Sequence, residues 1–172
     1  MSTRFEVSGP FKIPTTRHGG GKRVDKKQLG QFWTDIGDDF LAEAKGCYVF
    51  AMRAGKGTLP IYVGRTSSKT FRGECFTNDK LLKLTNGMMA YKRGTPVLFL
   101  VAHQKRKGKP NLKAIRAMEQ FLIQNAWVRN PDNLQNVHFT QPEWNWWIAG
   151  VFRSQPGKPT HAAVRFRAVV GL

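Results

Sequence analysis

Residues 46 to 64 read GCYVFAMRAGKGTLPIYVG, and this segment gives the strongest indication of the fold of the chain. Two apolar runs that contain β-branched and aromatic residues, Cys47–Met52 and Leu59–Gly64, flank the turn-like segment Arg53–Gly57. Runs of this length and composition are typical of strands, and a short Gly-rich connection joins antiparallel neighbours. The sequence therefore predicts a β-hairpin near the centre of the chain.

The segments that follow the hairpin alternate between helix and strand patterns. Residues 71 to 91 carry apolar side chains at helical spacing, interrupted near Asn86-Gly87, and Pro96–His103 is an apolar run typical of a buried strand. A clear helix is predicted over residues 111 to 128, with Asn111 as its N-cap. We expect a mixed α/β fold, in which a small three-stranded antiparallel sheet is flanked by helices.

Two basic extensions flank this core, which we place at residues 41 to 140. Residues 1 to 40 begin as an arm rich in Gly and basic residues and lead into a helix predicted over Leu29–Lys45. Alternating apolar residues over Phe5–Ile13 predict a short strand in the arm that lies against the core. Residues 141 to 172 form the second extension, which is basic and rich in tryptophan.

The C-terminal extension contains a tryptophan cluster, Trp144, Trp146 and Trp147, followed by a helix predicted over Thr160–Val170 with Thr160 as its cap. Three interpretations of the cluster remain open at this point. The rings can pack as core beneath the extension, form a docking surface for another protein, or stack on unpaired bases.

The chain carries a large excess of positive charge. It has 28 Lys and Arg residues against 11 Asp and Glu, so its formal net charge is +17. Such a surface gains affinity for any nucleic acid through counterion release. Nucleic acid is therefore the expected partner, but charge alone does not separate an enzyme from a binding protein.

The remaining composition favours a soluble, cytoplasmic protein without a membrane partner. The apolar runs are too short to span a bilayer, and no apolar segment follows the basic residues near the N-terminus. Cys47 and Cys75 have no Cys or His partner at ligand spacing, so we expect reduced, partly buried thiols rather than a disulfide or a zinc site.

Glu119 lies on the apolar stripe of the helix predicted over residues 111 to 128. Ile115 precedes it by one helical turn and Leu122 follows it by another, so the three side chains share one face. Two interpretations remain open. The stem can pack while the carboxylate pairs with a nearby Lys or Arg, or the carboxylate can face a cleft and hold Mg²⁺, which prefers oxygen ligands.

Two motifs and the residues that follow them resemble the GIY-YIG nuclease family. The motifs are Gly46-Cys47-Tyr48 and Tyr62-Val63-Gly64, and Arg65 comes directly after the second. Members of that family have a Gly-x-Tyr strand, a short turn and a Tyr-x-Gly strand. They continue with an Arg on the next helix, a later helix that carries a lone metal-binding Glu, here Glu119, and then an Asn. The resemblance covers residues 46 to 136 of the 172.

The resemblance implies a metal-dependent endonuclease that hydrolyses phosphodiester bonds in DNA with one Mg²⁺ or Mn²⁺ ion. Glu119 would be the protein ligand of the ion. Tyr48 and Tyr62 would line the cleft, one assisting deprotonation of the attacking water and the other orienting it. Arg72 would contact the scissile phosphate and Arg65 would act on the same phosphate or water, since a guanidinium binds phosphate oxygens bidentately and stays charged.

The Asn of the family pattern has three candidates here: Asn130, Asn133 and Asn136. Asn136 is favoured because members commonly show Leu and then Asn at the strand-like end of this segment. Its side chain would brace the site by hydrogen bonds. Ordinary turn chemistry is the alternative for all three.

The sequence departs from the family pattern at Phe76, where members usually have a His or Tyr. Either Tyr48 supplies the proton-transfer role of that residue, or the chain is a weak or inactive relative that binds nucleic acid without cutting it. Double-stranded DNA is the partner we expect, although the resemblance does not separate DNA from RNA and leaves the oligomeric state open.

Cations outside the motifs are expected to contact the phosphate backbone. They lie in the loop after the hairpin, in the loop before the helix at 111 to 128, and in the C-terminal extension. They are Lys69, Lys105, Arg106, Lys107, Lys109, Arg153 and Lys158. Contacts of this kind strengthen binding to any base sequence.

Overall fold

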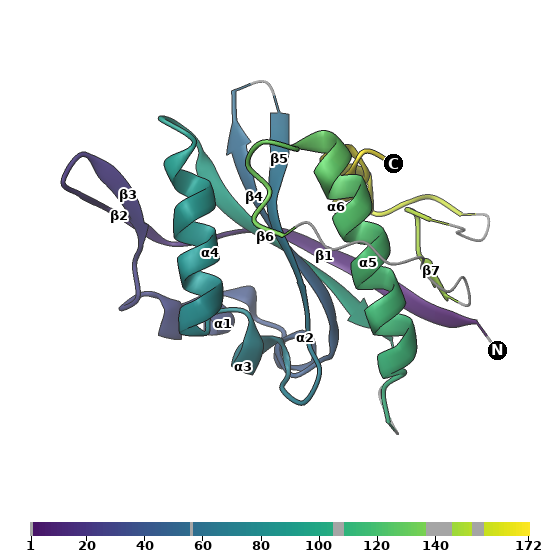
Figure 1. The fold of residues 1–172 in the computed structure, drawn as a ribbon. Coiled ribbons are helices and arrows are strands. Elements are labelled where there is room, and N and C mark those ends of the chain that lie inside the picture. Colours follow the sequence, from purple (N-terminus) through teal and green to yellow (C-terminus); the bar gives the residue numbers. More distant parts are fainter. Residues whose placement is uncertain (1, 56, 105–108, 137–145, 153–156) are drawn as a thin grey trace.

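A computed structural model describes residues 2–55, 57–104, 109–136, 146–152 and 157–172, except for the side chain of His18 (Figure 1). Its elements are β1 (Thr3–Lys12), β2 (Thr15–His18), β3 (Gly21–Val24), α1 (Leu29–Ile36), α2 (Asp39–Ala42), β4 (Gly46–Ala54), β5 (Gly57–Arg65), α3 (Phe71–Glu74), α4 (Asn78–Met89), β6 (Thr95–His103), α5 (Leu112–Arg129), β7 (Trp146–Ile148) and α6 (His161–Val170). No helix in these ranges has both the length and the apolar character needed to cross a membrane.

Five strands form the main sheet, in the order β5-β4-β6-β1-β7. β4 pairs antiparallel with both β5 and β6, which confirms the predicted hairpin and the predicted buried strand. The expected three-stranded sheet is too small, because β1 pairs antiparallel with β6 and β7 pairs parallel with β1. The α/β class is confirmed, and the sheet is larger than predicted.

β1 joins the sheet because its apolar side chains alternate. Phe5 and Val7 are buried in the cluster beneath α5 and α6. Arg4 and Glu6, which alternate with them, remain partly exposed and form an ion pair with each other. The first part of the expected N-terminal arm is therefore a strand inside the sheet, with β6 on one side and β7 on the other.

The described tryptophans of the C-terminal extension lie in β7, at the edge of the sheet opposite β5. Trp146 is fully buried, and its ring centroid lies 5.2 Å from that of Phe121. Trp147 lies beneath the guanidinium of Arg4, with 5.4 Å between Cζ and the ring centroid. Core packing is thus confirmed for Trp146, while Trp144 lies outside the described residues.

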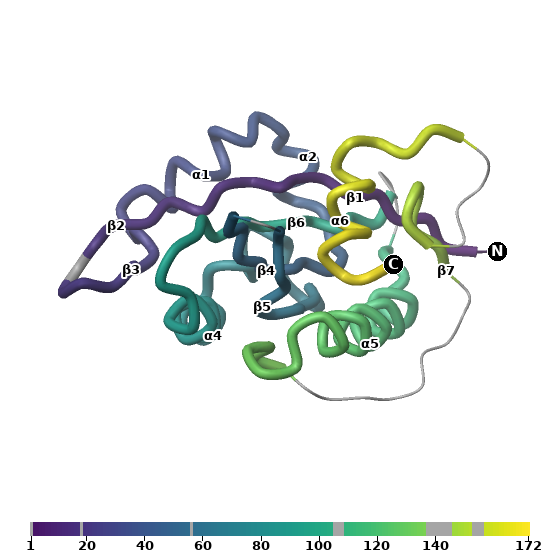
Figure 2. The backbone as a smooth tube through the Cα atoms, turned by 90° about the horizontal axis from the view of Figure 1, so that it is seen from above, coloured from purple at the N-terminus to yellow at the C-terminus, as the bar shows by residue number. Residues whose placement is uncertain are grey.

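Helices cover both faces of the curled sheet (Figure 2). α5 and α6 pack over a cluster that includes Val49 and Val63, whereas α1 to α4 pack over a cluster that includes Tyr48, Phe50 and Leu98. β5 is an edge strand, and in both views it runs between α4 and α5. This edge is where side chains from both layers approach one another.

The single helix predicted over Leu29–Lys45 is wrong in its extent. Gly37 adopts a left-handed conformation with φ 69° and ends α1, because a residue without a Cβ tolerates this conformation at no steric cost. Asp38 then starts α2, and its side chain accepts a hydrogen bond from the backbone N–H of Leu41 at 2.9 Å.

The two predicted helix caps are confirmed. The side chain of Asn111 accepts a hydrogen bond from the N–H of Ala114 at 3.1 Å and starts α5. The side chain of Thr160 accepts from the N–H of Ala163 at 3.1 Å and starts α6. Each side chain satisfies one of the N–H groups that the first helical turn leaves unpaired.

The interruption predicted near Asn86-Gly87 is also in the wrong place. The break falls at residues 75–77, between α3 and α4, and α4 continues to Met89. Gly87 instead allows α4 to approach β5 closely, since a Cβ at this position would lie 1.8 Å from Cγ2 of Ile61. The glycine is a packing residue within a continuous helix.

Replacing Gly87 by Ala tests this close approach. We expect Gly87→Ala to lower the free energy of unfolding by about 1–3 kcal/mol, because the new methyl group and Ile61 cannot both fit without displacement. Gly30 in α1 is a matched control, since nothing lies within 4 Å of its Cβ position. Gly30→Ala should raise the free energy of unfolding by about 0.5–1 kcal/mol. Urea unfolding followed by tryptophan fluorescence measures both, and a stabilised Gly87→Ala protein would contradict the packing.

β2 and β3 form a separate two-stranded antiparallel ribbon. Its two-residue turn consists of Gly19 and Gly20, with φ 56° and 81°, and positive φ at both positions matches the twist of a hairpin. Figures 1 and 2 show the ribbon projecting beyond α4. The Gly-Gly pair was the sequence signal for this hairpin, and the arm interpretation missed it.

Candidate active site

Close packing explains the glycines of the motifs Gly46-x-Tyr48 and Tyr62-x-Gly64. A Cβ at Gly46 would lie 2.0 Å from the carbonyl oxygen of Val101 on β6, so only glycine fits there. A Cβ at Gly64 would lie 2.4 Å from Cζ of Tyr48. The second glycine therefore makes room for the Tyr48 ring, which lies over β5 toward the edge of the sheet.

The hydroxyl group of Tyr48 is buried without a hydrogen-bond partner among the described residues. A buried polar group of this kind costs free energy and calls for an explanation, such as an ordered water or a ligand. Burial raises the pKa of Tyr48 far above its ordinary value, and the neighbouring Cys75 and Tyr62 raise this pKa further. The phenol therefore stays protonated at neutral pH.

Tyr62 lies beside Tyr48, with 6.2 Å between the ring centroids. Two lysines of α4 approach the Tyr62 ring: Nζ of Lys80 lies 5.6 Å and Nζ of Lys83 lies 4.9 Å from the ring centroid. These distances suit cation–π contacts. Burial raises the pKa of Tyr62, and the charge of Lys80 and its hydrogen bond to the phenol oppose that rise.

Sequence reasoning missed Lys80 and Lys83. Their spacing of three residues places them on one face of α4, which was the available signal. Nothing in the sequence indicated that this face turns toward Tyr62, because the α4–β5 contact joins segments that are not adjacent in the chain. Lys80 also pairs with Asp79 at 2.8 Å, and its side chain is only 18% exposed.

Arg65 and Glu119 form an ion pair at the end of β5. Nε of Arg65 donates to Oε2 of Glu119 at 2.8 Å, and the two side chains are 33% and 16% exposed. Pairing of Glu119 with a nearby Arg, one of the two interpretations of its sequence position, is thus confirmed. Its second oxygen, Oε1, receives no hydrogen bond within the described part of the chain, so the pair does not exclude a cation at this carboxylate.

The pH dependence of stability tests the burial of Glu119. Burial raises the pKa of Glu119, and the charge of Arg65 only partly opposes this. The folded protein therefore holds this proton more tightly than the unfolded chain, so stability is highest below the unfolded pKa and falls as pH rises through the folded pKa. Gln has no such titration and can still accept a hydrogen bond from Arg65.

We expect Glu119→Gln to melt at a higher temperature than the wild type at about pH 8, with a smaller difference at about pH 4. Thermal unfolding followed by circular dichroism at several pH values measures this. A Glu119→Gln protein that is less stable than the wild type at neutral pH would mean that the Arg65 pair outweighs desolvation of the carboxylate.

The side chain of Asn136 forms hydrogen bonds with the backbone at the open edge of β5. Its Oδ1 accepts from the N–H of Val63 at 3.2 Å, and its Nδ2 donates to the carbonyl oxygen of Val63 at 2.6 Å. Asn130 adds a second contact on the same strand by donating to the carbonyl oxygen of Pro60 at 2.7 Å. These bonds satisfy backbone groups that an edge strand leaves unpaired. Of the three candidates, Asn136 lies nearest along β5 to Arg65.

Arg72 is directed toward α2 rather than toward Glu119. Its Nη2 lies 2.9 Å from a carboxylate oxygen of Asp39, and its Nε lies 2.8 Å from one of Glu43. Contact with a phosphate bound near Glu119 would require this side chain to leave both partners. The structure therefore places Arg65, Glu119 and Asn136 along β5 and brings Glu119 close enough for its charge to add to the effect of burial in raising the pKa of Tyr48 and Tyr62, but it does not bring Arg72 to them.

Phe76, the departure from the family pattern, packs within an aromatic cluster. Its ring stacks on Phe50 with centroids 6.0 Å apart and meets Phe32 edge-on at 5.1 Å. The position therefore provides a partly buried aromatic side chain that packs against the core and has no proton to transfer. Tyr48, with its unpartnered hydroxyl group, is the phenol that the fold buries in the same layer.

The cations expected to contact DNA fall in two groups. Lys69, Lys109 and Lys158 are exposed, and Lys69 lies in the loop that follows Arg65. The others lie outside the described residues: Lys105, Arg106, Lys107 and Arg153.

A metal ion at this site would depend on Glu119. In the described ranges, no three His, Cys, Asp or Glu side chains lie close enough to hold a metal ion together. One half-buried carboxylate suits a hard cation such as Mg²⁺, which keeps several waters and completes its shell with substrate phosphate. The donor set therefore fits a single-carboxylate cation and does not fit an all-protein cage.

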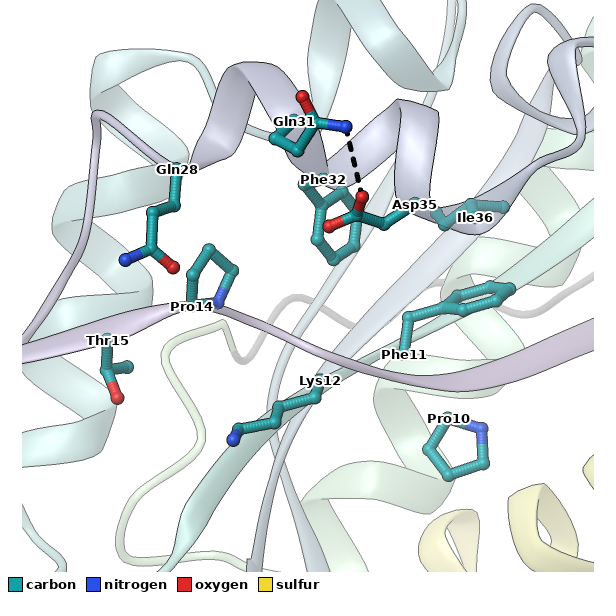
Figure 3. A pocket seen from close by; sticks show the side chains of 10 residues that line it. All are labelled: Pro10, Phe11, Lys12, Pro14, Thr15, Gln28, Gln31, Phe32, Asp35 and Ile36. Carbon is teal, nitrogen blue, oxygen red and sulfur yellow. Dashed lines mark hydrogen bonds between the residues drawn. The ribbon is translucent and has the colours of Figure 1, made fainter.

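A separate hollow of about 760 Å³ lies between the end of β1 and α1 (Figure 3). Phe11, Phe32 and Ile36 contribute apolar surface, and Gln31 donates a hydrogen bond to Asp35 at 3.1 Å. None of the residues that line this hollow belongs to the cluster around Glu119, so we assign it no part in the same site.

The cluster at the edge of β5 is the candidate active site. It combines two buried phenols and the carboxylate of Glu119 with three cations, Arg65, Lys80 and Lys83, and both lysines also pair with the exposed carboxylate of Asp79. Cations of this kind bind phosphate oxygens, and buried hydroxyl groups can position water. Comparisons of this chain with protein-family models, with curated proteins and with solved structures gave no match.

Proposed function

We propose that this protein is a metal-dependent endonuclease that hydrolyses phosphodiester bonds in DNA. The observation that carries the proposal is the unpartnered hydroxyl group of Tyr48, which is buried beside Tyr62 and lies within electrostatic range of Glu119, the partner of Arg65. Folding leaves a buried hydroxyl group unsatisfied at a cost, and a bound water or substrate oxygen would remove that cost. The order of the motifs, which resembles that of GIY-YIG nucleases, supports the same conclusion.

Each residue of the candidate active site has a proposed role that follows from its chemistry. One N–H group of Arg65 donates to Glu119, and the remaining N–H groups can bind a phosphate. Lys80 and Lys83 add positive charge beside Tyr62, where charge develops on the phosphate. Tyr48 stays protonated because of its burial, so it positions the attacking water by hydrogen bonds. A Mg²⁺ or Mn²⁺ ion bound at Glu119 would supply further positive charge to the phosphate and the leaving oxygen.

A second candidate function is nucleic-acid binding without cleavage. Phe76 supplies no proton, and Arg72 is held by Asp39 and Glu43, so two positions that the resemblance assigns to catalysis are engaged elsewhere. A binding protein would associate with DNA in a salt-dependent manner, without a divalent ion and independently of Glu119. The two candidates therefore differ in the effect of the metal ion.

Cleavage of supercoiled plasmid separates the candidates. We expect nicked circles to form in the presence of Mg²⁺ or Mn²⁺ and not in the presence of a chelator. Duplex, branched, nicked and single-stranded DNA and RNA extend the test to other substrates. Absence of cleavage on all of them with Mg²⁺, Mn²⁺, Co²⁺ and Ni²⁺ would refute the enzyme and leave the binding protein.

A further inference from the structure

The β2–β3 ribbon has the shape of a rigid, narrow finger. Its register pairs Thr15 with Val24 and Arg17 with Lys22, and the tip is the Gly19-Gly20 turn. No atom lies within 4 Å of the Cβ position at either turn glycine, so the tip is slender, and it lines a hollow together with Met88 and Met89 at the end of α4. Strands of four residues extend about 13–14 Å, at about 3.4 Å per residue.

The ribbon and its base are strongly cationic. Arg17, Arg23, Lys26 and Lys27 are exposed, and no described carboxylate forms an ion pair with any of them. The single acid in this region is Asp25. Its side chain accepts a hydrogen bond from the backbone N–H of Lys27 at 3.0 Å and so stabilises the turn at the base of the ribbon. The four cations are thus available to an anionic partner.

The base of the ribbon is anchored to the body of the protein. The N–H of Asp25 donates to the carbonyl oxygen of Pro14 at 2.9 Å. The N–H of Ile13 donates to the carbonyl oxygen of Pro96 at 3.0 Å. Nζ of Lys22 donates to the carbonyl oxygen of Gly94. These contacts hold the ribbon in a defined direction relative to the sheet.

One helix separates the ribbon from the candidate active site. Leu81 and Thr85 of α4 line a hollow together with Thr16 and Arg23 of the ribbon. The neighbouring face of α4 carries Lys80 and Lys83 to Tyr62. Since a helix with its side chains is about 10–12 Å across, the cations of the ribbon lie about one helix diameter from the site.

We propose that the β2–β3 ribbon enters the major groove of B-form duplex DNA and holds the duplex across α4, beside the candidate active site. The proposal rests on the proposed function and narrows its substrate to duplex DNA. The major groove of B-DNA is about 12 Å wide and about 8.5 Å deep and admits a two-stranded ribbon. The major groove of A-form RNA is deep and too narrow for side chains to read. The length of the ribbon is sufficient to reach the floor of the B-form groove.

Binding measured without divalent ions tests the ribbon separately from cleavage. The wild type, Arg17→Ala/Arg23→Ala and the control Arg165→Ala/Arg167→Ala are compared by fluorescence anisotropy in the presence of a chelator. The control removes two exposed arginines of α6, so the change in net charge is the same. The probes are a DNA duplex, an RNA duplex of the same sequence, and the DNA duplex with glucosylated 5-hydroxymethylcytosine, which fills the major groove. Thermal unfolding checks that both variants are folded.

We expect the wild type to bind the plain DNA duplex about tenfold or more tightly than the other two probes. Arg17→Ala/Arg23→Ala should lose this preference, and its slope of log K against log salt should shrink by about 2, since each lost phosphate contact removes about 0.9. The control should keep the preference. Equal binding of the three probes by the wild type, or a preserved preference in Arg17→Ala/Arg23→Ala, would overturn the proposal.

If the ribbon variant does not fold, Lys26→Ala/Lys27→Ala at the base of the ribbon replaces it, with the same expected loss of preference. The two proposals fail in different ways. Groove-dependent binding without any cleavage would refute the nuclease alone. Cleavage accompanied by binding that is indifferent to the filled groove would refute the ribbon alone.

Discussion

Glu119→Ala is expected to reduce divalent-cation-dependent nicking of supercoiled plasmid by about 100-fold or more, while DNA binding is retained. The variant removes the carboxylate that pairs with Arg65 in the described part of the chain, and with it the oxygen donors for a cation at this edge of the sheet. Binding should persist because the loss of an acid does not weaken the attraction of a chain with net charge +17 for phosphate. Single-turnover nicking with Mg²⁺ and anisotropy without it measure the two properties.

Asp132→Ala is the matched control for this experiment. Asp132 is an exposed acid in the turn after α5, so its removal changes the net charge equally. It should nick plasmid at the wild-type rate. If Glu119→Ala nicks as fast as the wild type and still requires a divalent ion, Glu119 is not the metal ligand and its role is limited to the Arg65 pair.

Tyr48→Phe is expected to slow cleavage by about 100-fold, the low end of what a positioned proton donor or acceptor contributes. The change removes the hydroxyl group and keeps the ring that packs over Gly64. Because this hydroxyl group has no partner in the described protein, its removal should leave the free energy of unfolding unchanged or raise it. Loss of activity without loss of stability identifies a functional group rather than a structural one.

Tyr91→Phe is the control, and the opposite result is expected for it: a loss of stability without a loss of cleavage. The hydroxyl group of Tyr91 accepts a hydrogen bond from Nδ2 of Asn130 at 3.0 Å. Its removal should cost about 1 kcal/mol of stability and leave cleavage intact. A Tyr48→Phe protein that is destabilised but fully active would mean that the Tyr48 hydroxyl group is satisfied by a structural water and takes no part in the reaction.

Features that depend on neighbouring residues in the chain were predicted well. The β4–β5 hairpin follows from two apolar runs around a Gly-containing turn, and both caps follow from an Asn or Thr placed before an apolar helix. The inward direction of Glu119 follows from helical periodicity, because Ile115 and Leu122 are buried on the same face. In each case the deciding interaction lies within a few residues.

Features that depend on distant contacts were missed or misplaced. Gly87 has the local signature of a helix break, but its meaning depends on Ile61, which approaches it from β5. β1 has the pattern of a strand, but its place between β6 and β7 depends on pairing with two strands that lie more than 80 residues further along the chain. Propensity and periodicity carry no information about which segments will meet.

The candidate site also has features that depend on neighbouring residues in the chain and features that depend on distant contacts. Local patterns in the chain were enough to predict the two tyrosine strands, the position of Arg65 after the second strand, and a carboxylate on an apolar helix face. The pairing of Arg65 with Glu119 and the approach of Lys80 to Tyr62 depend on how the folded chain brings distant segments together. The same is true of the contact between Arg72 and Asp39 and of the Tyr48 hydroxyl group, which has no partner among the described residues. Charges and hydrogen bonds act over a few ångströms in space, so their partners are fixed only when α4 and α5 pack against β5 and α3 packs against α2.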